Sequence, residues 1–218
     1  GLHDFVSDID VLVDEAKISG SNIWDIRKNS FNKVVNRKGI NDNCLRIQTV
    51  GNDCSLGKMV TSIEINKKLI EKGYKSKFVA TGQTGILIEG DGLPIDCIKG
   101  DFINGAAEQL VLDNKINDIM IIEGQGSLIH PRYSSVTLGL LHGALPHALI
   151  MCYEMGRKNI IGFDNIYIPD LQEVINIYEK MANVMFPCKV IGIAINGRHF
   201  TQAEVDKEAE RVSTKYNL

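Results

Sequence analysis

Residues 51–58 combine glycine and lysine at a spacing that is typical of a phosphate-binding loop. Gly51 and Gly57 enclose five residues, and Lys58 follows directly. In such a loop the backbone amides and the start of the next helix present unpaired N–H donors and partial positive charge, and the lysine adds a full charge for the outer phosphates. Glycine at both ends permits backbone angles and close approaches that a Cβ would block. The other interpretation is a tight turn that carries a surface lysine.

The loop departs from the commonest form of this motif in two ways. The usual pattern has four residues between its glycines and a Mg²⁺-binding serine or threonine after the lysine, whereas this chain has five residues and Met59. The loop is still expected to hold a pyrophosphate, either that of ATP or that of coenzyme A. The residues predicted to bind this cofactor are Gly51, Asn52, Asp53, Cys54, Ser55, Gly57, Lys58 and Met59.

An acidic residue follows the apolar run at 119–122. Glu123 comes where that run ends, and Gly124 begins a glycine-bearing loop. Acidic side chains at the carboxyl ends of buried parallel strands commonly complete a nucleotide–Mg²⁺ site, because the ligands of open α/β sheets gather at that edge. We therefore predict that Glu123 faces the phosphates, directly or through Mg²⁺, as a catalytic residue and metal ligand. The alternative is that it caps the next helix.

Other side chains suit proton transfer or carboxylate binding. Asp53 could orient a water or act as a base, or be a turn residue that bonds its own backbone. Histidine as a residue type suits proton transfer, so His130 is a candidate, and a structural role is the alternative. Arg132 and Arg157 could each clamp a substrate carboxylate through two parallel hydrogen bonds, or serve in ordinary ion pairs. The predicted catalytic residues are Asp53, Lys58, Glu123 and His130.

Alternating apolar and amphipathic segments must position these residues. Strands are predicted at 44–50, 77–80, 119–122, 148–152 and 190–195, and helices at 58–72, 102–114, 136–142, 171–182 and 201–216. The strands are apolar nearly throughout, as strands buried on both faces are. This alternation predicts an α/β fold of the P-loop NTPase kind, with a mostly parallel sheet and helices on both faces. A glycine-bearing loop at 81–85 would lie at the same edge, so Thr81, Gly82, Gln83 and Thr84 are predicted to bind substrate.

Composition excludes several classes of protein. The 218 residues carry a net charge of −3, which gives no basic face for nucleic acid. No run approaches the ~18–20 apolar residues of a membrane span, and no signal peptide opens the chain. The five cysteines are scattered, which favours a reducing cytoplasm over a disulfide or zinc framework. Residues 1–43 are interpreted as a connector, with a short helix at 8–19 and an edge strand or packing clip at 23–26, and residues 44–218 as the P-loop domain.

Once these motifs are aligned along the chain, two resemblances emerge. Residues 51–58 resemble the loop of dethiobiotin synthetase and its relatives. A closer resemblance covers nearly the whole chain, because residues 1–5, 23–28, 81–85, 100–102, 130–139 and 195–198 are similar to a bacterial P-loop family that includes D-glutamate N-acetyltransferase. That resemblance implies a Rossmann-like domain before residue 1, acetyl-CoA as donor and a D-amino acid as acceptor. The resemblance to the dethiobiotin synthetase relatives makes Asn196 similar to a base-reading asparagine, whose amide offers both a donor and an acceptor to adenine, and the alternative is a turn residue at the end of a strand.

Three functions remain open from the sequence. The first is an N-acetyltransferase that moves an acetyl group from acetyl-CoA to a D-amino acid. The second is an ATP- and Mg²⁺-dependent ligase or kinase that acts on a carboxylate, and the third is a non-catalytic nucleotide-binding module. All three bind adenosine phosphates, so the loop does not separate them. A small amino acid as substrate and a homo-oligomeric, cytoplasmic protein are expected.

Overall fold

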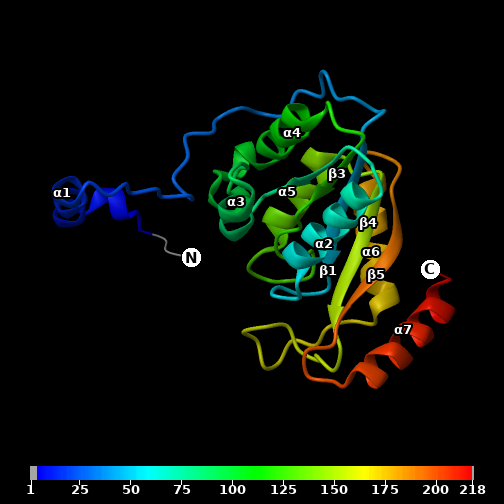
Figure 1. Ribbon diagram of the computed structural model, residues 1–218. Helices are drawn as coiled ribbons and strands as arrows, with labels where there is room; N and C mark the ends of the chain where they lie inside the picture. The colour runs from blue at the N-terminus through cyan, green and yellow to red at the C-terminus, as the bar shows by residue number, and fades with distance from the viewer. Residues whose placement is uncertain (1–3, 218) are drawn as a thin grey trace.

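A five-stranded parallel sheet forms the centre of the protein in a computed structural model that describes residues 4–217. The strands are β1 (Leu45–Gly51), β2 (Ser76–Val79), β3 (Ile119–Ile122), β4 (Ala148–Glu154) and β5 (Lys189–Asn196). They lie in the order β2-β3-β1-β4-β5, and every neighbouring pair is parallel (Figure 1). The register sets Ile47 of β1 beside Ile121 of β3 and Ala148 of β4. The predicted α/β fold and all five predicted strands are confirmed.

Helices follow the strands as the alternation predicts, with one exception. They are α2 (Lys58–Glu71), α3 (Gln83–Glu89), α4 (Ile103–Asn114), α5 (Ser134–Ala144), α6 (Leu171–Asn183) and α7 (Gln202–Tyr216). The prediction of a loop over residues 81–85 is wrong from Gln83 onward, because α3 begins there. The glycines misled the prediction. Gly82 is the N-cap of the helix, and Gly85 lies inside the helix at a position where a Cβ would collide with Glu123.

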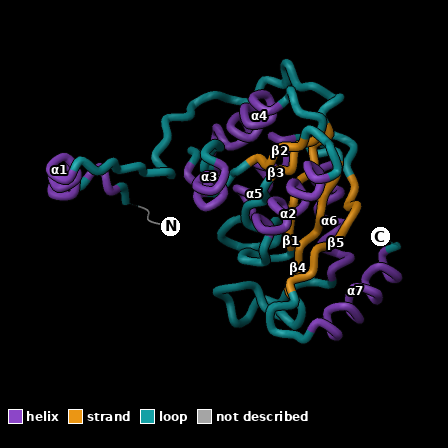
Figure 2. Tube along the Cα trace, in the orientation of Figure 1, coloured by secondary structure: helices purple, strands orange, loops and turns teal. Residues whose placement is uncertain are grey.

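The helices cover both faces of the sheet (Figure 2). On one face, α2 packs Ile65 and Leu69 against Ile47 and Ile121. On the other face, α4, α5 and α6 pack against the sheet through two larger apolar clusters, in which Tyr178 of α6 is fully buried. Burial on both faces explains why the strands are apolar nearly throughout.

The connections place the ends of β1, β3 and β4 at one edge. The chain leaves β1 towards β2 and β3 on one side, and it returns to β4 on the other side of β1. In open α/β sheets the crevice at such a reversal of strand order is where ligands bind. The loops after these three strands, which contain most of the predicted site residues, therefore meet at this edge.

The segment before the sheet divides into a projecting helix (Figure 1) and a stretch that packs on the body, where Phe31 and Ile40 contact the core cluster under α4. Helix α1 (Asp10–Ser19) has no buried residue, leaves Val11 and Ile18 exposed, and projects away from the sheet (Figure 1). Residues 23–28, which we call the N-terminal strap, return to the body. Ile26 packs against the cluster that contains Phe78 and Ile86. The strap forms no strand, so the packing-clip interpretation of residues 23–26 is the correct one, and the predicted short helix is confirmed.

Candidate functional site

The phosphate-binding loop connects the end of β1 to the start of α2. Gly57 adopts a φ of 100°, in the left-handed region that glycine tolerates best. Gly51 lies so close to Leu56 and to the carbonyl of Cys152 that a Cβ would meet atoms at 2.8 and 3.1 Å. Both terminal glycines are therefore required for the geometry of the loop. Lys58 is the first residue of α2, so its amide belongs to the positive end of the helix.

Unpaired donors converge in this loop. The backbone amides of residues 55–60 donate to no oxygen of the part of the chain that the structure describes. The Lys58 ammonium is buried, and it donates to the backbone oxygen of Asp53 at 2.8 Å. Burial lowers the pKa of Lys58. Amides without acceptors around a buried lysine match the chemistry of a phosphate group, which supplies both the missing oxygens and the missing negative charge.

A cavity of about 540 Å³ opens beside these donors, and we call it the phosphate cavity. Its floor is the loop and the first turn of α2, and its opposite wall contains Glu123 and the glycine-bearing loop at 124–126. Arg27 and Asp96, which the sequence analysis did not select, also line it. The cavity is therefore large enough for the end of a nucleotide or coenzyme together with a small substrate.

Glu123 uses its two carboxylate oxygens differently. Oε2 accepts hydrogen bonds from the amides of Thr81 at 2.9 Å and Gly82 at 3.0 Å, which lead into α3. Oε1 accepts none from the described residues, and the side chain lines the phosphate cavity. Burial raises the pKa of Glu123, while the two amides act in the opposite direction. Glu123 thus bonds the two amides that precede α3 and caps neither α3 nor α5, and its Oε1 is an acceptor at the cavity without a donor among the described residues.

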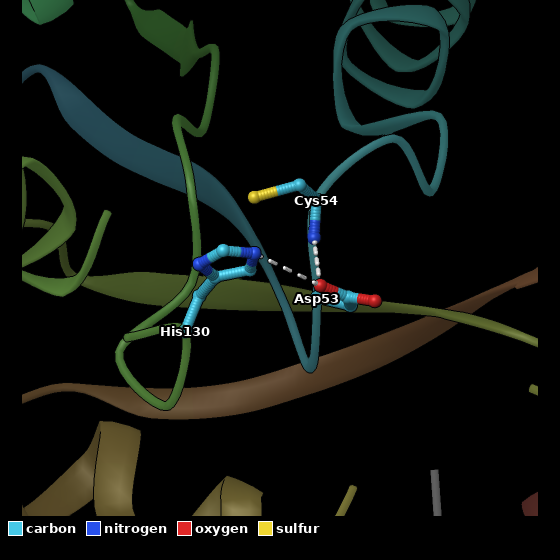
Figure 3. A group of neighbouring side chains, drawn as sticks. All are labelled: Asp53, Cys54 and His130. Carbon is cyan, nitrogen blue, oxygen red and sulfur yellow. Dashed lines mark hydrogen bonds and ion pairs between the residues drawn. The ribbon is translucent and has the colours of Figure 1, made fainter. Parts of the chain in front are cut away.

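A second group of predicted residues lies on the other side of the loop, and we call it the Asp53 network. It consists of Asp53, Cys54 and His130, which Figure 3 shows, together with Arg157. The buried Asp53 carboxylate accepts from the Cys54 amide through Oδ1. Its Oδ2 accepts from Arg157 at 2.9 Å and from the amide of Ile161 at 2.8 Å. Arg157 also donates to Glu154 at 2.6 Å. Arg157 is therefore held by carboxylates of the protein itself.

His130 is buried within the same network. Its Nδ1 accepts from the amide of Arg132 at 3.1 Å, which assigns the ring proton to Nε2. Nε2 lies 3.3 Å from the carbonyl of Ile161 and 3.9 Å from Asp53 Oδ1. The ring stacks on Tyr133 at 4.5 Å. Both ring nitrogens thus have partners within the protein.

The ligand atoms of Asp53, Cys54 and His130 lie within 4.8 Å of one another, so a metal ion was considered there. The hydrogen bonds of the Asp53 network argue against it. They already use the carboxylate oxygens and His130 Nδ1, and the Arg157 guanidinium lies 2.9 Å from Asp53. Burial also raises the pKa of the Cys54 thiol, whereas a metal needs the thiolate. These residues fit a hydrogen-bond network that holds the loop better than a metal centre.

Asn196 lies on the far side of the loop from Glu123. It lines a cavity of about 320 Å³ with Gly57, Thr61 and Arg198. Its side-chain amide donates to the carbonyl of Leu56 at 3.1 Å. We call this the base-side cavity, because it borders the same loop at the position where a base would follow the phosphates.

The structure therefore separates the predicted site residues into groups. Lys58, Glu123 and the loop meet at the phosphate cavity, whereas Asp53, His130 and Arg157 form the network behind the loop. The predicted substrate residues Gln83 and Thr84 line a separate cavity of about 270 Å³ beside the N-terminal strap. Two other predicted substrate-binding residues make contacts within the protein. The Thr81 hydroxyl donates a hydrogen bond to the carbonyl of Glu123 and accepts one from Gln125, and the Arg132 guanidinium stacks over Phe163 at 4.6 Å.

The fold and the loop define a P-loop nucleotide-binding α/β domain. More narrowly, the chain belongs to the family described as the P-loop domain of DUF1611, a domain of unknown function, whose model matches residues 33–218. Two curated relatives span the whole chain and are named D-glutamate N-acetyltransferase. One, from a Pseudoalteromonas species, is 39% identical over 219 residues, and one from Tritonibacter scottomollicae is 37% identical. The chain spans 66% of the length of each.

Solved structures agree with this assignment. A crystal structure of a DUF1611 family protein from Anabaena variabilis matches 91% of this chain and 59% of its own, with a TM-score of 0.87 and 38% identity. A nucleotide-binding protein from Archaeoglobus fulgidus, solved with ADP, matches 80% of this chain and 78% of its own with a TM-score of 0.52. At 11% identity this second likeness shows the fold alone. Residues 1–3, where the resemblance noted above begins, lie outside the described residues. Within residues 4–217, no helix is both long and apolar enough to cross a membrane.

Proposed function

We propose that this chain forms the coenzyme-binding part of an N-acetyltransferase that moves an acetyl group from acetyl-CoA to the amine of a D-amino acid, D-glutamate first. The observation that carries this proposal is the phosphate cavity. It is lined both by the phosphate-binding loop and by Glu123, whose pKa is raised by burial. The names of the two curated relatives support the reaction and its acceptor.

In the proposed reaction the loop amides and Lys58 hold the pyrophosphate of acetyl-CoA. The acceptor enters as an ammonium ion and must lose a proton before it attacks, and Glu123 Oε1 accepts that proton. The amine nitrogen then forms a bond to the acetyl carbon, and the carbon–sulfur bond breaks. The nitrogen gives up its second proton to the departing coenzyme A thiolate, and Glu123 releases the first proton to water, so the protein ends the cycle unchanged.

The residues at the loop favour this reaction over phosphoryl transfer. Met59 stands where a Mg²⁺-binding hydroxyl is usual, and a thioether is a poor ligand for this hard cation. Ser62, one turn further along, is buried in bonds to Thr49 and to the carbonyl of Lys58. Glu123 remains as a carboxylate that fits Mg²⁺ through Oε1. An ATP-dependent ligase or kinase is therefore the second candidate, and the assay must distinguish it from the N-acetyltransferase.

The test is a thiol-release assay run beside an ADP-release assay on this protein, across D- and L-amino acids. We expect free coenzyme A to appear only with a D-amino acid, fastest with D-glutamate, and no ADP. Formation of ADP that depends on the amino acid, without thiol release, would instead support the ligase or kinase. Tight nucleotide binding with neither product would support a binding module.

A binding experiment separates the two nucleotides directly. Coenzyme A carries a 3′-phosphate that ATP lacks, and Arg198 lines the base-side cavity next to Asn196. We expect acetyl-CoA to bind at least tenfold more tightly than 3′-dephospho-acetyl-CoA, and Arg198→Gln to abolish that difference. Equal affinity for both compounds in the unmodified protein would count against this orientation of the coenzyme.

A further inference from the structure

We propose that Arg27, on the N-terminal strap, binds a carboxylate of the acceptor amino acid. This inference rests on the proposed function and adds the part of the site that recognises the acceptor. An amino acid with an acidic side chain carries two carboxylates and one ammonium ion at neutral pH, so its site needs a cation close to the reacting centre. The two arginines expected from the sequence to fill this role, Arg132 and Arg157, do not line the phosphate cavity.

The charged residues that line the phosphate cavity indicate that Arg27 is the residue that binds the acceptor carboxylate. Of the described residues that line this cavity, only Lys58 and Arg27 are positively charged. Lys58 is the first residue of α2 and lies among the unpaired loop amides, so it is committed to phosphate. Arg27 lines the cavity together with its ion-pair partner Asp96. An arginine there can donate to a substrate carboxylate through the Nη2 that bonds Asp96.

The protein holds Arg27 in place from both sides. The preceding residue, Ile26, packs into the cluster of Phe78 and Ile86, which anchors the strap to the sheet and α3. The guanidinium donates to Cys97 Sγ at 2.6 Å and to Asp96 at 3.0 Å, and its side chain is 12% exposed. The Asp96 side chain is 41% exposed and can turn towards water. A substrate carboxylate can therefore replace Asp96 on Arg27 without leaving the Asp96 carboxylate buried and unpaired.

The arrangement also accounts for the ammonium ion. Glu123 lines the same cavity, and its Oε1 accepts no hydrogen bond from the described residues. With the carboxylate on Arg27, an amine directed at Glu123 would lie on the side of the cavity that faces the loop. Arg27 is then a substrate-binding residue that sets the acceptor class, and the strap is a wall of the site.

The test compares variants of neighbouring residues on the strap. Arg27→Gln should raise the KM for D-glutamate at least 30-fold and change the Kd for acetyl-CoA less than twofold, and Arg27→Lys should retain part of the effect. Lys28→Gln is the matched control, because Lys28 bonds Ser7 and Asp8 and does not line the cavity. It removes the same charge from the same strap, and we expect both constants to stay within twofold.

A second variant separates direct binding from anchoring of the strap. Asp96→Asn removes the ion-pair partner of Arg27, so it should lower the KM for D-glutamate if the substrate competes for Arg27. If the ion pair matters only because it anchors the strap, Asp96→Asn would raise this KM as much as Arg27→Gln does, and direct binding would be disproved. A KM unchanged in Arg27→Gln would also overturn the proposal.

Calorimetric titration of D-glutamate into the coenzyme A complex gives a readout that does not need turnover. If the unmodified protein binds D-glutamate but releases no thiol, the proposed reaction fails while Arg27 is still tested by its variant. In that case weaker binding by Arg27→Gln than by Lys28→Gln supports the assignment, and equal binding refutes it. Absence of D-glutamate binding in the unmodified protein overturns both proposals.

Discussion

The two sides of the phosphate-binding loop are built on opposite principles. On the Lys58 side, donors lack acceptors and the phosphate cavity separates them from Glu123. On the Asp53 side, both carboxylate oxygens of Asp53 and both ring nitrogens of His130 have partners within the protein, and both residues are buried. Unsatisfied donors around a cavity indicate ligand binding, whereas satisfied ones indicate support. The environment of a side chain, and not its residue type, therefore indicates whether a predicted catalytic residue contacts a ligand or supports the loop.

The largest effect should come from the supporting side. Asp53→Ala leaves Arg157 without one of its two carboxylates and leaves the amides of Cys54 and Ile161 without an acceptor. Loss of one partner from a buried ion pair costs about 3–5 kcal/mol, and the remaining bond to Glu154 favours the lower figure. Urea unfolding measures the change in the free energy of unfolding.

The matched control for this prediction is Asp113→Ala, an exposed aspartate on α4. It should change stability by less than about 0.5 kcal/mol. If Asp53→Ala were as stable as this control but had lost turnover, Asp53 would be a catalytic residue and the division of the site would be wrong.

The sequence could predict features that depend on local spacing, but not those that depend on the tertiary fold. The loop was predictable because its requirements are local: glycine at both ends and a lysine at the start of a helix. Arg157 donates to Asp53 across 104 positions of sequence, and that pairing depends on where β4 ends relative to β1. Spacing along the chain contains no signal for it. Arg27 was not selected because the path of the strap over α3 is a tertiary feature, and its only signal was a family-like segment at 23–28.

On the ligand side, Glu123→Gln should remove turnover and leave the fold intact. The glutamine carbonyl can still accept from the amides of Thr81 and Gly82, but it cannot accept a proton. Loss of a general base typically lowers kcat by about 100-fold or more. Single-turnover thiol release measures this step, with Glu89→Gln as control, because Glu89 pairs with Lys77 outside the cavity. Turnover equal to that of the unmodified protein would place Glu123 among the supporting residues.

A smaller effect is expected for Lys58→Ala. Removal of the ammonium should weaken acetyl-CoA binding at least tenfold, or about 1.4 kcal/mol. Folding should be little affected, since the fold buries this charge at a cost that lowers its pKa. Calorimetry of acetyl-CoA binding provides the measurement, and Lys67→Ala, exposed on the same helix, provides the control. Equal affinity in both variants would show that Lys58 does not contact the phosphates.

The smallest effect concerns pH and the carboxylate of Glu123. Because burial raises the pKa of Glu123 in the folded protein above its unfolded value of 4.5, the folded state binds this proton more tightly than the unfolded state does. The associated stability is fully present below pH 4.5 and is lost as the pH rises through the folded pKa. The slope of this loss cannot exceed about 1.4 kcal/mol per pH unit for one proton.

Glu123→Gln isolates this contribution, because glutamine does not titrate and keeps the two hydrogen bonds from the amides of Thr81 and Gly82. Above pH 4.5 the unmodified protein should lose stability relative to the variant, and the difference between their free energies of unfolding should level off once the carboxylate is ionised in both states. Acetyl-CoA, which brings negative phosphates into the same cavity, should extend that loss to higher pH by disfavouring the ionised form further. Parallel stability curves for the two proteins, with and without acetyl-CoA, would mean that Glu123 is as solvated as an exposed carboxylate. The contrast between a ligand side and a supporting side would then not extend to Glu123.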